Sequence, residues 1–172
     1  SVLLVALATP SLPGQQVARG QHDATVAAAE VAARRGDWGS AVALAGQVAG
    51  AYQANGSSWS VPDLIAAGRA FAVLGARDPK YFHDALQAFD RASARDSSNT
   101  DSRLRAADLL LEKYNAPDAA SSYREVLAIA PGNAHALLGL ARVLRFDGDG
   151  GATAAVRGSI AADSLYAPAR VL

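Results

Sequence analysis

The side chains that could carry chemistry are few in this sequence and lie far apart. The chain has three histidines, His22, His83 and His135, and no cysteine. No histidine has a second histidine or a carboxylate four residues on, and the sequence contains neither a P-loop nor a dinucleotide-binding fingerprint. We therefore predict that the chain is not an enzyme, and that it has no catalytic residue, no metal ligand and no cofactor.

The run Asp147-Gly148-Asp149-Gly150-Gly151 is the one segment that invites a calcium interpretation. An EF-hand loop needs an oxygen ligand where Gly151 stands and a bidentate glutamate where Gly158 stands. Both ligands are absent, so we interpret the run as a turn between helices.

Composition narrows the fold class. The 172 residues are 51% hydrophobic but only 6% aromatic, and the difference is mostly alanine, with 41 residues. Alanine has the highest helix propensity, whereas strands favour β-branched and aromatic residues, so closely packed helices are expected. The 16 basic and 16 acidic residues give a formal net charge of zero. A nucleic-acid partner therefore has no electrostatic basis.

A period of 34 residues runs through the second half of the chain. Residues 84–99 align with residues 118–133 so that Phe89 matches Tyr123 and Asn99 matches Asn133, each 34 residues on. A third copy at 152–167 follows at an offset of 33. A related spacing of small residues occurs at 36–52. Regular spacing of this kind is typical of stacked repeats.

Each copy follows another segment with apolar residues at helical spacing, such as Leu137, Leu140, Ala141 and Leu144. Ser60 and Asn133 are expected to cap helices, and Gly68, Ala107 and Ala141 to let helices approach closely. We predict helices over 22–35, 38–53, 61–76, 80–96, 100–114, 117–130, 134–146 and 151–163, with another start near 167.

This 34-residue helix–turn–helix unit resembles the tetratricopeptide repeat (TPR) family. The residues that carry the resemblance are Ala119, Tyr123, Val126 and Pro131 on a second helix and Leu137, Leu140, Ala141 and Leu144 on a first helix. The resemblance implies an all-α solenoid of about four helix pairs over 22–172, wound as a right-handed superhelix. The unit that starts near Ser60 departs from the pattern by about five extra residues between its helices.

In the TPR family the first helices line the concave face, and the register then predicts which side chains are exposed there. The predicted partner-binding residues are Ile65, Arg69, Leu104, Asp108, Leu138, Arg142 and Arg145. The carboxylate clamp of some family members needs Asn or Lys where this chain has apolar residues, so the clamp is not expected. An apolar stripe edged by charge suits a helix or an extended segment of a partner. The alternative is that the stripe packs against the chain's own N-terminal segment or a neighbouring repeat.

Trp38 stands in the turn where repeats of the TPR family usually have an aromatic residue. We expect this side chain to pack in the core, with contact to a ligand as the alternative.

Residues 1–21 form an apolar and Pro/Gly-containing segment, which we interpret either as the remnant of a signal peptide or as a packing tail. The apolar run 2–8 is too short to span a membrane. The many alanines and arginines suggest a bacterial source, and a periplasmic or secreted location is expected.

We predict a non-catalytic scaffold that binds another protein, within a membrane-associated assembly. The alternatives are the repeat arm of a longer secreted enzyme whose catalytic domain lies beyond residue 172, and a pilotin-like assembly factor.

Overall fold

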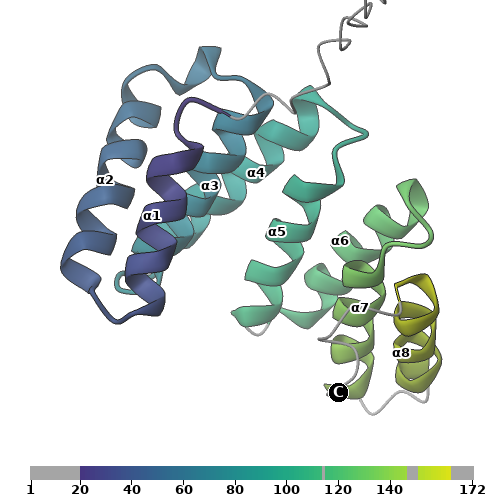
Figure 1. The fold of residues 1–172 in the computed structure, drawn as a ribbon. Helices are drawn as coiled ribbons and strands as arrows, with labels where there is room; N and C mark the ends of the chain where they lie inside the picture. Colours follow the sequence, from purple (N-terminus) through teal and green to yellow (C-terminus); the bar gives the residue numbers. More distant parts are fainter. Residues whose placement is uncertain (1–19, 114, 147–150, 164–172) are drawn as a thin grey trace, which may run out of the picture.

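The computed structural model describes residues 20–113, 115–146 and 151–163, which form eight α-helices and no strand (Figure 1). The helices are α1 (Asp23–Arg34), α2 (Trp38–Asn55), α3 (Val61–Gly75), α4 (Tyr81–Arg95), α5 (Thr100–Glu112), α6 (Ala116–Ile129), α7 (Ala134–Phe146) and α8 (Gly151–Ala162). A 3₁₀ turn, η1 (Gly56–Ser58), follows α2. The predicted all-α solenoid is confirmed, with helix bounds that agree within two residues. The N-terminal run 2–8, the Asp147–Gly150 part of the glycine-rich turn and the helix start near 167 lie outside the described residues.

Neighbouring helices pair along the chain, and the pairs stack side by side (Figure 1). Each helix packs on the next one, and the odd-numbered helices also contact one another, α1 with α3, α3 with α5 and α5 with α7. The odd-numbered helices therefore form one layer of a solenoid, which is the arrangement that the repeat predicts for its first helices.

Polar caps fix where several helices begin. Ser60 accepts a hydrogen bond from the Asp63 amide, Asn99 from the Ser102 amide and Asn133 from the Ala136 amide. Each cap satisfies one of the amides that a helix start leaves without a partner. The α1–α2 turn instead needs Gly36, whose φ of 79° is in the left-handed region. Asp37 then caps α2 through the Ser40 amide at 3.1 Å, and hydrogen bonding with Ser40 lowers the pKa of Asp37.

Small residues let the helices come close together. Gly68 of α3 lies against the Phe89 ring of α4, and a Cβ built on it would stand 2.3 Å from Phe89 Cε1. Gly139 of α7 has the same relation to Tyr123 of α6, at 2.2 Å from Cζ. Ala107 and Ala141 are completely buried. The expected packing role of Gly68, Ala107 and Ala141 is therefore met, and Gly139 joins them.

The buried residues form two clusters that meet at α5. The first cluster contains residues of α1 to α4 together with Ala106 and Leu109 of α5. The second cluster contains residues of α5, α6 and α7, among them Leu104 and Ala107. Helix α5 thus contributes one face to each cluster, and its face toward α3, with Leu109, belongs to the first.

The extra residues of the second unit form the connection 76–80 between α3 and α4. In this turn the Asp78 amide donates to the Leu74 carbonyl, and the Tyr81 amide donates to the Asp78 carbonyl. The inserted residues therefore form a hydrogen-bonded turn between α3 and α4.

Candidate functional site

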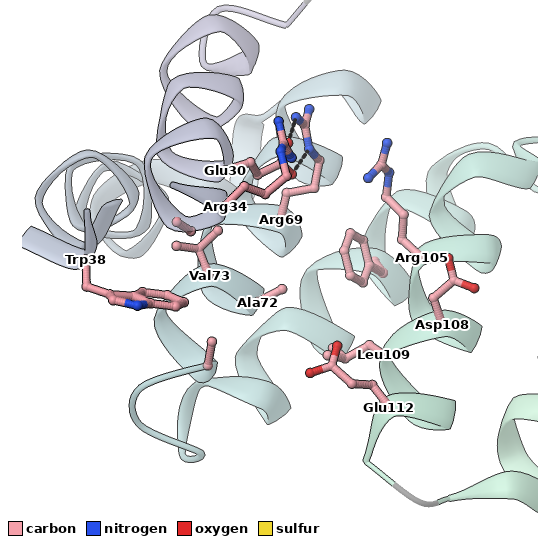
Figure 2. Close-up of a pocket in the computed structure, with 13 residues that line it drawn as sticks. Glu30, Arg34, Trp38, Arg69, Ala72, Val73, Arg105, Asp108, Leu109 and Glu112 are labelled. Carbon is pink, nitrogen blue, oxygen red and sulfur yellow. Dashed lines mark hydrogen bonds and ion pairs between the residues drawn. The ribbon is translucent and has the colours of Figure 1, made fainter. Parts of the chain in front are cut away.

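A groove opens on the layer of odd-numbered helices, between α1, α3 and α5, with a volume of about 360 Å³ (Figure 2). The residues that line it are Glu30, Ala33, Arg34, Trp38, Arg69, Ala72, Val73, Ala76, Phe89, Arg105, Asp108, Leu109 and Glu112. Phe89 belongs to α4, which lies behind this layer. Its presence in the lining means that α3 and α5 leave a gap, at which the second layer contributes to the floor.

The floor of this groove is apolar. Ala72 and Val73 come from α3, Phe89 from α4 and Leu109 from α5. Val73, Phe89 and Leu109 are at most 9% exposed, so they are held by the core and present only a small fixed surface. A rigid apolar floor of this kind can accept an apolar side chain without reorganising.

Trp38 stands at one edge of the groove, at the start of α2 (Figure 2). It packs in part against the first core cluster, and the Arg77 guanidinium lies 5.3 Å from its ring centroid. One part of the side chain therefore packs on the core and another part lines the groove, and contact with a ligand stays a prediction.

Arg69 sits in the middle of α3 and ties two helices together. Its side chain is 12% exposed and donates two hydrogen bonds to Glu30, at 2.8 and 2.7 Å, and one to Asp23, at 2.5 Å. The hydrogen bonds to Glu30 raise the pKa of the Arg69 guanidinium, although burial alone would lower it. The charge of Arg69 is thus used within the chain, to hold α1 against α3.

Arg69→Met is expected to lower the free energy of unfolding by about 1–3 kcal/mol, because it leaves two partly buried carboxylates without their cation. Urea unfolding measures this loss. Arg105→Met is the control, because Arg105 pairs with Asp101 of its own helix on a more exposed surface. Such a pair is worth less than about 1 kcal/mol. Equal losses in the two variants would contradict the structural role given to Arg69.

Asp108 of α5 separates the groove from a second hollow of about 300 Å³. It accepts a hydrogen bond from the Tyr123 hydroxyl at 2.6 Å, and its carboxylate lies 2.9 Å from Nε2 of His135. Asp108 and Glu112 line both cavities, and Leu111, Tyr123, His135 and Arg142 complete the second. The two cavities follow one another along the same layer of helices.

The apolar residues that were predicted to bind a partner lie outside both hollows. Ile65, Leu104 and Leu138 are 8%, 9% and 1% exposed, and none of them lines the groove or the second hollow. Ile65 belongs to the first core cluster and Leu104 to the second, so both side chains pack within the chain. Packing of the stripe within the chain is the alternative considered above.

The charged residues of the prediction are distributed differently. Arg69 and Asp108 line the groove, Arg142 lines the second hollow, and Arg145 is exposed on α7 and lines neither cavity. Arg69 and Asp108 already have partners within the chain. Arg69, Asp108 and Arg142 therefore line the two hollows, over a floor made of other residues.

Sequence reasoning missed Arg105 and Leu109 of α5, together with the contribution of Phe89 to the floor. Arg105 and Leu109 lie one position beyond Leu104 and Asp108, on the side of α5 that faces α3. The aromatic pattern marked Phe89 as core, which is correct, but no sequence signal shows that a gap in the first layer exposes its edge.

The described part of the chain contains neither a candidate metal-binding cluster nor a candidate membrane-spanning helix. No group of three or more histidine, aspartate or glutamate side chains there could hold a metal ion. None of the described helices combines the length and hydrophobicity needed to cross a bilayer.

Comparison with known proteins identifies the fold. No protein-family model matches the sequence, and no curated protein matches it. Among solved structures, the chain is similar to TTC0263, a thermophilic TPR protein of Thermus thermophilus, with a TM-score of 0.66 and 15% identity over 87% of this chain and 78% of that one. It is also similar to YrrB, a TPR protein with an unusual peptide-binding site, with a TM-score of 0.61 and 18% identity over 87% and 73%.

A third similar structure is MamA from Desulfovibrio magneticus RS-1, with a TM-score of 0.54 and 20% identity over 83% of this chain and 76% of that one. The chain therefore has the TPR fold, as the 34-residue repeat predicted.

Proposed function

We propose that the chain is a non-catalytic interaction module that holds an extended segment of a partner protein in the groove between α1, α3 and α5. The observation that carries the proposal is the groove itself, a fixed apolar floor of Val73, Phe89 and Leu109 beneath a rim of charged side chains. An apolar centre with polar groups at its border is the usual composition of a recognition site.

The succession of hollows suits an extended segment. The groove and the next hollow follow one another along the layer and share Asp108 and Glu112 in their linings. An extended chain that runs along the layer can place one side chain in the groove and a later one in the second hollow.

Ala72→Trp is expected to block the groove, because Ala72 is a partly exposed floor residue of α3 and an indole there would occupy the cavity. Peptides selected on the native protein from a displayed random library should bind this variant at least about tenfold more weakly by fluorescence polarisation.

The matched control is Ala128→Trp, which adds the same side chain at an exposed position of α6 that lines neither cavity. The control variant should bind the peptides like the native protein, and both variants should keep the native circular dichroism spectrum. Equal binding by the two variants, or a library that yields no binder, would refute the proposal.

A further inference from the structure

We propose that the groove selects a segment in which acidic side chains flank an apolar anchor, and that Arg34 and Arg105 bind those acidic side chains. The inference rests on the proposed function and specifies the chemistry of the partner. It follows from the hydrogen-bond donors that the groove leaves unused.

The three arginines of the groove differ in what they already bind. Arg69 has both carboxylates of its network in place, so it has little capacity for a ligand. Arg34 is exposed and makes no hydrogen bond or ion pair with any described residue. Arg105 binds Asp101 through Nε alone, at 3.0 Å from each carboxylate oxygen. The terminal nitrogens of its guanidinium have no acceptor among the described residues.

Arg34 and Arg105 stand on opposite sides of the groove (Figure 2), one from α1 and the other from α5. Each guanidinium offers a planar set of N–H donors, which matches a carboxylate better than any other side-chain acceptor. An apolar side chain on the floor between them would leave the neighbouring residues of an extended segment near the two rims. Carboxylates at those neighbouring positions would accept hydrogen bonds from the unused N–H donors of the two guanidinium groups.

The rest of the lining determines where these acidic residues can lie. Glu30 is paired with Arg69 and Glu112 with Lys113, whereas Asp108 places negative charge at the border with the second hollow. A second acidic group at that border would be repelled. The acidic residues of the segment should therefore stay beside Arg34 and Arg105, and the part that continues over Asp108 should lack negative charge.

The continuation of the layer into the second hollow also favours an internal segment over a chain terminus. Asp108 and Glu112 line both cavities, so a bound chain can pass from one to the other without leaving the surface. The ligand groups that we assign are therefore aspartate or glutamate side chains, and not a C-terminal carboxylate.

The test uses a random dodecapeptide library displayed with both ends joined to carrier protein, selected in parallel on the native chain and on Arg34→Glu/Arg105→Glu. The native chain should enrich Asp and Glu within two positions of a large apolar residue. The double variant should enrich Lys and Arg at those positions instead. Replacing one acidic residue of a native-selected peptide by its amide should weaken its binding about tenfold, and added salt should weaken it further.

The matched control is Arg35→Glu/Arg124→Glu, which makes the same change in charge at exposed positions that line neither cavity. This control should select the same acidic peptides as the native chain. Acidic enrichment that persists in Arg34→Glu/Arg105→Glu would overturn the inference.

Two further outcomes separate this inference from the proposed function. The selected peptides could show no enrichment in Asp and Glu and still fail to bind the Ala72→Trp variant. That result would overturn the inference and leave the proposed function standing. If no selected peptide is sensitive to Ala72→Trp, both fail.

Discussion

Tyr123→Ala is expected to lower the free energy of unfolding by about 3–5 kcal/mol, which is the usual cost of removing a large buried aromatic side chain. Tyr123 is 1% exposed in the second core, and its ring occupies the space that Gly139 leaves open. Urea unfolding followed by circular dichroism measures the loss. A decrease of less than about 1 kcal/mol would contradict this account of the second core.

Tyr123→Phe separates packing from hydrogen bonding, because it keeps the ring and removes only the hydroxyl that donates to Asp108. We expect a loss of about 1 kcal/mol, since Asp108 is partly exposed and keeps His135 as a neighbour. The same variant should change peptide binding more than its small effect on stability suggests, because Asp108 lines both cavities.

Gly68→Ala is expected to destabilise the first core by about 1–3 kcal/mol, although alanine normally favours a helix over glycine by about 1 kcal/mol. The added methyl group would stand 2.3 Å from Cε1 of Phe89, so this ring, which is 2% exposed and packed in the first core, or the helix itself would have to shift. Thermal unfolding of the variant gives the sign of the effect directly.

Gly46→Ala in α2 is the control, because nothing lies within 4 Å of the new Cβ there. This variant should be more stable than the native chain by up to about 1 kcal/mol. Adding Phe89→Leu to Gly68→Ala should recover part of the loss through a coupling term between the two sites. Destabilisation of the same size in both glycine variants would show that backbone effects, and not the Phe89 contact, determine the result.

The helices could be predicted from the sequence because their signals are local. The 34-residue period, the caps at Ser60 and Asn133 and the small residue Gly68 each act within one helix or one helix pair, and all have their expected structural roles. Which side chains are exposed between successive first helices is not determined by local sequence. It depends on how closely successive first helices approach, and the period of a single repeat does not specify that distance.

Ile65 and Arg69 illustrate the difference. Both were placed correctly on α3, but Ile65 is buried and Arg69 is bound by carboxylates of α1, 39 and 46 residues away in sequence. Only the three-dimensional arrangement shows which acidic residue reaches which arginine. The groove likewise depends on the gap between α3 and α5, through which Phe89 contributes from the second layer.

The division of the core at α5 has a mechanical consequence. One wall of the groove belongs to a block built on α1 to α4, and the other wall is α5, which also anchors the block of α6 and α7. A segment bound between these walls would contact both α3 and α5, so a change in the angle between these two helices would have to compress or release it. Bending of the solenoid should therefore weaken the binding of a segment in the groove. Conversely, the solenoid with a bound segment should resist bending more than the solenoid without one.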